Sequence, residues 1–310
     1  MRLAVFTNMY PARVTTFFER DLRALISSGV EVDVFAIHPL DPSQWQYTLR
    51  LLGPEVLPRE RVHHLSQAAA WASARPWPPA RARRFVGDAV QILAAAARFG
   101  PVPLAKTAYV LPQAWAWAEA FQDRFDHVLA YWGNYAGTCA YLFHRLATPG
   151  IPFSIWLHAG ADLYFRPVFL ARKVAYADRI ITCCAFNRGY LARAFPTMAD
   201  SLTRKVHVCY HGLDLNTLRF NPDHRLPNRL VAVGRLAQDK GFDNLLRAMR
   251  ALADRGTVTQ LDLVGAGPEE RPLGALARRL DLAAHVRFRG WLPFAEVQTA
   301  MQNATVLVHP

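Results

Sequence analysis

The first two-thirds of the chain alternates short apolar runs with amphipathic segments. Residues 2–8 (RLAVFTN) and 30–37 (VEVDVFAI) have the length and apolar content of buried strands. Between them, residues 15–29 place their large apolar side chains on one helical face, with Thr16 and Glu19 at capping-box spacing. A strand, a helix and a second strand in this order predict a parallel sheet.

The same alternation continues to residue 212, with one interruption. Residues 66–122 show no strand pattern, and two or three helices are predicted there. The further strands are expected at 126–133, 152–159, 178–184 and 205–212, and the further helices at 135–147, 168–177 and 186–195.

A second series of strands and helices follows a stretch without periodicity. Residues 216–228 are rich in Asn, Pro and Asp, which is typical of an interdomain linker. Strands are then expected at 229–235, 258–264, 285–290 and 305–309, and helices at 242–254, 270–281 and 294–303. We therefore predict an α/β protein whose two Rossmann-like domains, 1–215 and 229–310, face each other across a cleft.

The last predicted strand suggests that the second domain is incomplete. In the common order of doubly wound sheets, the fourth strand lies beside the first, inside the sheet. A sheet that stops there exposes a long apolar edge, which proteins normally avoid. We therefore expect a chain that is truncated at Pro310.

Composition indicates the cellular compartment and the electric charge expected of binding partners. No apolar run approaches the roughly 20 residues of a membrane span, and the four cysteines lack metal-ligand spacing, which fits a reducing cytoplasm. The net charge of +12 fits an anionic ligand, a peripheral contact with the anionic inner face of a membrane, or an arginine-rich proteome. Because no helix-turn-helix, zinc-finger or RNP pattern accompanies it, nucleic acid is not an expected partner.

Residues 71–85 pair aromatic and arginine side chains, which suits either a membrane interface or an ordinary surface with anchoring tryptophans.

Two cations lie in the turn after the first strand of the second domain. Arg235 follows Gly234, and Lys240, one of four lysines beside thirty-two arginines, precedes the expected helix. Ligands of open α/β sheets bind outside the carboxyl ends of the strands, where a helix N-terminus also favours anions. The turn therefore predicts a diphosphate site, in which Arg235 can bind two oxygens and Lys240 supplies a compact charge. The alternative is an exposed loop with two solvated cations.

A second glycine pair, Gly265 and Gly267, follows the next strand. The third glycine of a dinucleotide fingerprint would fall at position 270, which is Glu270, so a nicotinamide dehydrogenase is disfavoured. Direct contact with a ligand and a tight turn before a helix both remain open for this pair.

Polar residues also follow two strands of the first domain. His158 lies at the carboxyl end of a buried strand with Asp162 close behind, and Asn134 begins a helix. All three are candidates for a ligand cleft. The alternatives are a core histidine with satisfied hydrogen bonds and a helix N-cap at Asn134.

No sequence motif predicts a metal or a resident cofactor. A D-x-D pair, an H-E-x-x-H motif and a P-loop are absent from the sequence. A leaving diphosphate would then be stabilised by Arg235, Lys240 and a helix N-terminus.

Eight segments, taken in order along the chain, carry a recognisable pattern. They are YPARVTTFFERDLRALISSGVEVDVFAIHP, IPFSIWLHA, ADRIITCCAFNRGYL, VHVCYHGLDLNTLRFNP, VGRLAQDKGFDNLLRAM, LDLVGAGPEE, VRFRGWLPFAEV and ATVLVHP. In order and spacing they resemble the retaining family 4 glycosyltransferases of the GT-B fold, in the branch that builds bacterial exopolysaccharides of the colanic-acid and amylovoran type. The resemblance covers nearly the whole chain.

This resemblance implies metal-independent transfer of a sugar from a nucleotide-diphosphate donor to a saccharide or lipid-linked saccharide acceptor. It implies that Arg235 and Lys240 hold the diphosphate and that His158 lies beside the donor sugar. The backbone at Gly290 and Trp291 would approach the nucleotide base. The nucleotide sugar is a co-substrate, and no cofactor is implied.

Three departures from the family pattern bear on this reading. Asp162 follows His158 one residue later than usual, and the turn after the first strand reads TNMYPARVTT where glycines are common. The two glutamates, eight residues apart, that hold the donor in this family do not occur before Pro310. We therefore expect the 310-residue chain to be weak or inactive as a transferase.

Two other functions remain beside an exopolysaccharide glycosyltransferase. One is a non-catalytic GT-B remnant or partner subunit that binds a nucleotide or another transferase. The other is a GT-B enzyme with a different reaction, such as a nucleotide-sugar epimerase.

Overall fold

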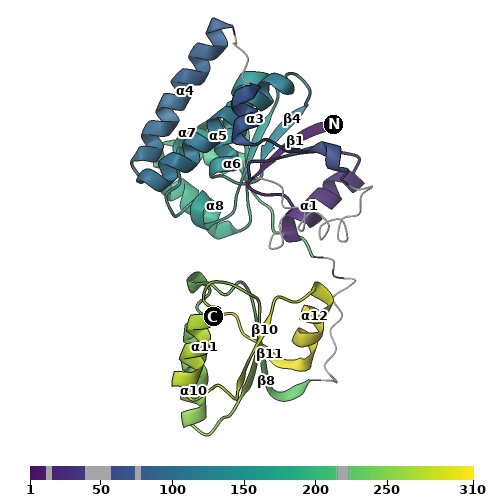
Figure 1. The fold of residues 1–310 in the computed structure, drawn as a ribbon, viewed down its shortest axis with the longest axis vertical. Helices are drawn as coiled ribbons and strands as arrows, with labels where there is room; N and C mark the ends of the chain where they lie inside the picture. Colours follow the sequence, from purple (N-terminus) through teal and green to yellow (C-terminus); the bar gives the residue numbers. More distant parts are fainter. Residues whose placement is uncertain (12–15, 39–56, 74–77, 214, 216–222, 224) are drawn as a thin grey trace. The chain divides into compact units, whose positions relative to one another are not determined.

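The chain forms two compact units, Met1–Gly212 and Leu213–Pro310, in the computed structural model (Figure 1). The structure describes residues 1–11, 16–38, 57–73, 78–213, 215, 223 and 225–310. Each unit has a parallel sheet and an apolar core of its own, which confirms the prediction of two Rossmann-like α/β units. Most of the linker predicted at 216–228 lies outside the described residues.

Unit 1 contains a seven-stranded parallel sheet in the order β3-β2-β1-β4-β5-β6-β7. The chain reverses its direction of winding between β1 and β4, which lie side by side, and ligands of such sheets bind at the carboxyl ends near this point. The strands are β1 (Arg2–Thr7), β2 (Glu31–Ala36), β3 (Val62–His64), β4 (His127–Ala130), β5 (Phe153–Leu157), β6 (Arg179–Thr182) and β7 (Val206–Val208).

Helices cover both faces of this sheet because successive strand residues point to opposite sides. Phe6 and Phe35 belong to the larger core, whereas their neighbours Val5 and Val34 belong to the smaller core on the other face. Within its described residues, the helices of unit 1 are α1 (Thr16–Ser27), α3 (Gln67–Ala72), α4 (Pro79–Ala97), α5 (Pro101–Ala120), α6 (Tyr135–Ala147), α7 (Leu170–Tyr176), α8 (Ala185–Ala194) and α9 (Ala199–Lys205).

Unit 2 contains a four-stranded parallel sheet in the order β10-β9-β8-β11. Its fourth strand therefore lies beside its first, as predicted, and Val306 and Leu307 on this edge strand are about half exposed (48% and 52%). The strands are β8 (Leu226–Val233), β9 (Gln260–Val264), β10 (Val286–Gly290) and β11 (Ala304–Leu307), and the helices are α10 (Phe242–Asp254), α11 (Glu270–Arg279) and α12 (Phe294–Asn303).

The predicted bounds of α6, α10 and α12 are confirmed, and residues 66–122 contain three described helices. β8 begins at Leu226, three residues before its predicted start, and two elements were missed. These are β3 and α9, with three and seven residues, which are too short to display a clear period. The side chain of Thr16 lies outside the described residues, so the capping box remains a prediction. No described helix is long and apolar enough to cross a membrane.

Candidate functional site

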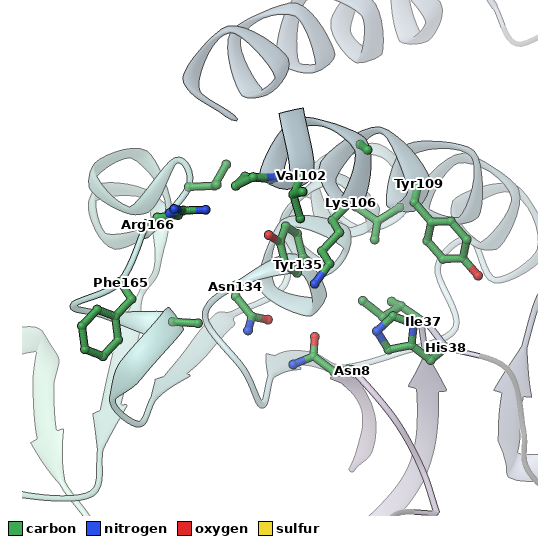
Figure 2. A pocket seen from close by; sticks show the side chains of 15 residues that line it. Asn8, Ile37, His38, Val102, Lys106, Tyr109, Asn134, Tyr135, Phe165 and Arg166 are labelled. Atoms are coloured by element: carbon green, nitrogen blue, oxygen red, sulfur yellow. The ribbon is translucent and has the colours of Figure 1, made fainter. Parts of the chain in front are cut away.

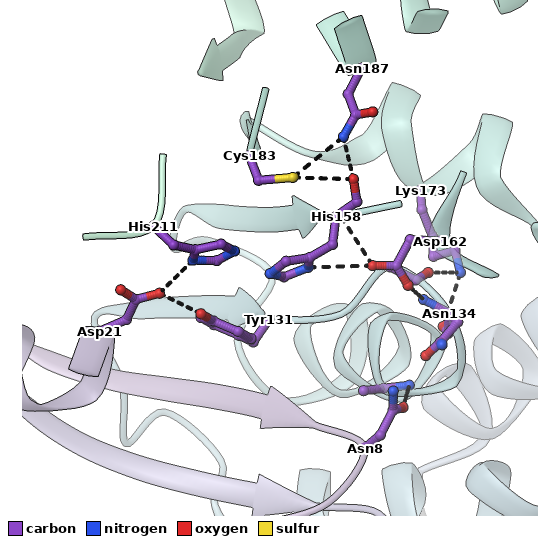
Figure 3. A network of polar contacts seen from close by, with 12 residues as sticks. Asn8, Asp21, Tyr131, Asn134, His158, Asp162, Lys173, Cys183, Asn187 and His211 are labelled. Carbon is purple, nitrogen blue, oxygen red and sulfur yellow. Dashed lines mark hydrogen bonds and ion pairs between the residues drawn. The ribbon is translucent and has the colours of Figure 1, made fainter. Parts of the chain in front are cut away.

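His158, Asp162 and Asn134, the three candidates of unit 1, lie together at the carboxyl end of β5 (Figure 3). Asp162 ends a single 3-10 turn, η2 (Gly160–Asp162), and its carboxylate is buried. That carboxylate accepts the backbone N–H of His158 at 3.2 Å and the backbone N–H of Asn134 at 3.1 Å. Asp162 therefore joins the connection that follows β5 to the connection between β4 and α6.

The imidazole of His158 is buried and electrically neutral in this environment. Burial lowers the pKa of His158, and the nearby Asp162 carboxylate, 3.5 Å from Nδ1, only partly opposes that effect. Its ring packs against Trp132, with 4.3 Å between ring centroids. In the described part of the chain, neither ring nitrogen makes a hydrogen bond. A neutral imidazole in this state can offer a nitrogen to a ligand.

Lys173, on α7, completes this network and was missed in the sequence. Its fully buried ammonium donates hydrogen bonds to the backbone carbonyls of Gly133 and Asn134 and to Thr138 Oγ1, at 2.5, 3.2 and 3.2 Å. Burial lowers the pKa of Lys173 to about 7, while the charge of Asp162 acts in the opposite direction. The sequence offered one signal for Lys173: it is one of four lysines beside thirty-two arginines.

A second polar group, also missed, lies on the other side of His158. His211 Nδ1 is 3.4 Å from Asp21 Oδ2, and the hydroxyl of Tyr131 donates to the same oxygen. Burial raises the pKa of Tyr131, so this hydroxyl keeps its proton. The His211 ring stacks on His158 at 5.2 Å and 10° (Figure 3). His211 lies in VHVCYHGLDL, one of the segments that carry the family resemblance, and this position could have identified it.

The alternative reading of Asn134 as the N-cap of α6 is confirmed for its position but not for a capping side chain. Asn134 occupies the N-cap position, but its backbone (φ −81°, ψ −121°) lies outside the extended conformation that capping requires, and its side chain makes no capping bond. Asn8, after β1, caps instead: its Oδ1 accepts the N–H of Ala136 at 3.3 Å. The side-chain oxygen of Asn134 is buried and has no hydrogen-bond partner among the described residues.

A cavity of about 710 Å³ opens beside this network (Figure 2). It lies at the carboxyl ends of β1, β2, β4 and β5, and α5 forms one wall. Asn8, His38, Lys106, Asn134 and Arg166 contribute its polar side chains, and most of the remaining lining is apolar or aromatic. This composition is typical of small-molecule sites.

In unit 2, the two predicted cations lie in one connection between β8 and α10. Arg235 follows the end of β8, and Lys240 ends a 3-10 turn, η4 (Gln238–Lys240). The guanidinium of Arg235 is 3.2 Å from Asp239, but both side chains are more than half exposed (56% and 59%). Such a pair is weak, so Arg235 can exchange it for a ligand. Gly241 has a φ of +65°, which glycine adopts without strain, and it turns the chain into α10.

The glycines of the neighbouring connection allow two backbones to touch. A β-carbon at Gly265 would lie 1.8 Å from the carbonyl oxygen of Gly234, and one at Gly267 would lie 2.3 Å from that of Leu236. This contact accounts for both glycines without a ligand. The carbonyl of Gly290, where β10 ends, accepts the N–H of Gly265 at 2.8 Å.

The unit 2 candidates therefore converge on one edge of the sheet. Gly234, Gly265 and Gly290 lie at the carboxyl ends of three adjacent strands, β8, β9 and β10. Arg235 follows the first of these glycines, and Trp291, 43% exposed, follows the last. Convergence at this edge is the arrangement that ligand sites of open α/β sheets share.

Two other predictions can be compared with the structure. Among the residues that it describes, no group of three or more His, Cys, Asp or Glu side chains is placed to hold a metal ion. In the segment 71–85, Trp71 is exposed, whereas Phe85 packs against Trp115 with 4.7 Å between ring centroids. Arg75 and Trp77 lie outside the described residues.

Comparison with known proteins gives these features a family context. Residues 217–310 match the family model described as Glycosyl transferases group 1. The chain is 30% identical over 110 residues to the colanic acid biosynthesis glycosyltransferase named WcaL of Escherichia coli, covering 34% of this chain and 27% of that protein. It is 33% identical over 218 residues to 2-deoxystreptamine glucosyltransferase of Streptomyces kanamyceticus, covering 62% and 54%. The chain thus spans about half of these relatives' length or less.

Solved structures share the fold over the whole of this chain. The lipopolysaccharide outer core galactosyltransferase WaaB superposes with a TM-score of 0.62 at 14% identity, covering 99% of this chain and 73% of WaaB. Anabaena Alr3699/HepE, in complex with UDP and glucose, superposes with a TM-score of 0.65 at 14% identity, covering 100% and 74%. The chain therefore has the GT-B fold, and its residues 217–310 carry the sequence pattern of the group 1 glycosyl transferases.

Proposed function

We propose that this protein is a glycosyltransferase of bacterial cell-surface or exopolysaccharide synthesis. It transfers a sugar from a nucleotide-diphosphate donor to a saccharide or lipid-linked saccharide acceptor, with retention of configuration and without a metal. The predicted domain 229–310, which lies in unit 2, binds the donor, and the predicted domain 1–215, which coincides with unit 1 to within three residues, binds the acceptor. The reaction takes place in the cytoplasm, and the cationic surface allows peripheral contact with an anionic membrane.

The observation that carries this proposal is the position of Arg235. It lies on the strand edge where Gly234, Gly265 and Gly290 converge, within the segment that matches the group 1 family. Arg235 and Lys240 would bind the diphosphate, and the backbone at Gly267, Gly290 and Trp291 would face the nucleotide. The relative from Streptomyces kanamyceticus is named a glucosyltransferase, and the HepE structure holds UDP and glucose, which supports a nucleotide-sugar donor here.

In the proposed reaction, the bond between the donor sugar and the diphosphate breaks, and the diphosphate leaves with the bonding electrons. The acceptor hydroxyl gives its proton to an oxygen of the leaving diphosphate and forms the new glycosidic bond on the same face of the sugar. Arg235 and Lys240 stabilise the charge that develops on the leaving diphosphate. His158, with its neutral ring and unpaired nitrogen, would accept a hydrogen bond from a sugar hydroxyl.

Calorimetric titration with UDP, GDP and ADP tests the donor site directly. Arg235→Gln and Lys240→Gln should each weaken binding of the preferred nucleotide by roughly 10- to 100-fold, because each removes a charge-assisted hydrogen bond. Arg255→Gln, at the opposite end of α10, serves as the charge-matched control and should leave affinity unchanged. Absence of affinity for every nucleoside diphosphate, in a folded protein, would contradict the proposal.

A further inference from the structure

The charged side chains that line the cavity of unit 1 in the described residues are all positive. Lys106 and Arg166 carry full positive charges, and none of the fifteen described lining residues is an aspartate or glutamate. Both cations are exposed, and in the described part of the chain neither forms an ion pair with a carboxylate. Their charges are therefore available to a ligand in the cavity.

Lys106 and Arg166 reach the cavity from separate elements. Lys106 extends from α5 and lies 5.9 Å from the centroid of the Tyr135 ring (Figure 2). Burial, and after it the positive charge of Lys106, lowers the pKa of His38, so the positive charge of the cavity comes from Lys106 and Arg166. Arg166 has a φ of +54°, a conformation that costs non-glycine residues about 1 kcal/mol or more and tends to occur at functional sites.

The uncharged lining suits a polyhydroxylated molecule. The amides of Asn8 and Asn134 point toward the cavity beneath Lys106 (Figure 2). The Asn134 oxygen is buried without a partner among the described residues, so a ligand hydroxyl would satisfy it. Tyr109 and Tyr135 supply aromatic surface for the apolar face of such a molecule.

We propose that this cavity binds the acceptor and that the acceptor carries an acidic group, a phosphate or a carboxylate, beside its hydroxyls. This inference rests on the proposed function and adds the chemical class of the acceptor. A neutral saccharide could use the amides and rings but would leave both cations without a partner. An acid on the acceptor pairs with Lys106 and Arg166 as well.

Titration of the 310-residue chain with glucose 6-phosphate, glucuronate and glucose at low ionic strength tests the inference. At least one of the two acids should bind roughly tenfold or more tightly than glucose, and the stronger one identifies phosphate or carboxylate. Lys106→Gln and Arg166→Gln should each remove most of that preference for the acid over glucose. Both variants keep a β-carbon and a polar side chain, and their thermal unfolding confirms that they remain folded.

Arg98→Gln is the matched control, because Arg98 is an exposed cation of the same unit that does not line the cavity. Equal affinities for the three probes, or an equal loss of preference in Arg98→Gln, would overturn the inference. Titration with UDP separates it from the proposed function. If UDP binds and neither acid exceeds glucose, the acceptor inference alone fails; if an acid binds through Lys106 and UDP does not bind, the donor proposal fails.

Discussion

Lys173 is the buried residue that ties together the connections around His158. Its ammonium donates to the carbonyls of Gly133 and Asn134, and its charge acts on Asp162, which in turn holds the backbone of His158. A buried lysine is costly unless it is paired and hydrogen-bonded. Its protonation state therefore affects the stability of unit 1.

The lowered pKa of Lys173 predicts a specific dependence of stability on pH. Its pKa is about 7 in the folded chain, against 10.5 for a solvent-exposed lysine, so between these values the unfolded chain binds a proton that the folded chain lacks. Stability should therefore rise as pH increases from 7 to 10.5, by at most about 1.4 kcal/mol per pH unit from this group. Urea unfolding of wild type and Lys173→Met across that range measures the difference in slope.

Lys205→Met provides the control for that experiment, since it removes one lysine outside the buried network. Its slope should match that of the wild type. Equal slopes for the wild type and Lys173→Met would show that Lys173 titrates alike in the folded and unfolded chains, contrary to the prediction.

At the scale of elements, the contact between the β8–α10 and β9–α11 connections shapes the sheet edge of unit 2 on which Arg235 lies. Gly265 and Gly267 are required because the carbonyls of Gly234 and Leu236 occupy the space where β-carbons would lie. The contact holds Gly234, which directly precedes Arg235, against the next connection. We therefore expect the placement of Arg235 to depend on Gly265 and Gly267, which let the two connections touch.

Replacing Gly265 by alanine should destabilise unit 2 by about 2–4 kcal/mol, because the new β-carbon meets a backbone oxygen that cannot move independently. Gly274→Ala is the matched control, since Gly274 lies inside α11 and a β-carbon there meets nothing closer than 3.9 Å. That change should stabilise the protein by about 0.5–1 kcal/mol. Chemical denaturation of both variants gives the comparison, and a neutral Gly265→Ala would be inconsistent with the structure.

The start of α6 offers a second comparison within one element. Asn8→Ala should cost about 1 kcal/mol, because it removes the side chain that accepts the N–H of Ala136. Asn134→Ala should cost under about 0.5 kcal/mol, because the Asn134 side chain makes no capping bond and its oxygen is unpaired among the described residues. Thermal or urea unfolding measures both, and the reverse ranking would restore Asn134 as the cap.

At the scale of the whole molecule, each unit is stabilised by its own apolar core. The core of unit 2 includes Leu246, Phe242 and Leu263, and the larger core of unit 1 includes Phe6 and Phe143. These clusters share no residue. Disruption of one core is therefore expected to remove protection against hydrogen exchange only from the sheet that packs on it.

Leu246→Ala should lower the unfolding free energy of unit 2 by about 2–5 kcal/mol, since Leu246 is fully buried and its truncation leaves a cavity. Hydrogen exchange measured by mass spectrometry should show faster exchange in the strands of unit 2 and unchanged exchange in β1 and β4. The reciprocal variant, Phe143→Ala, should affect the strands of unit 1. Loss of protection throughout the chain in either variant would show that the two units unfold together.

Sequence periodicity was sufficient for most of the fold because it reports which face of each element is buried. The helices α6, α10 and α12 were predicted at their observed bounds, since each carries a full amphipathic or apolar pattern. β3 and α9 were missed because their few residues form structure only through contacts with neighbouring elements. Short elements are determined by tertiary packing rather than by their own period.

The sequence by itself determined the class of the fold and the strand ends where His158, Arg235 and the glycines would lie. It did so because local periodicity and the geometry of parallel sheets place such residues at one edge. The tertiary structure alone decided that Lys173 lies beneath Asn134, that Asn8 replaces Asn134 as the cap, and that Lys106 and Arg166 line one cavity. These pairings join residues between 39 and 128 positions apart in the chain, and no local pattern records such distances.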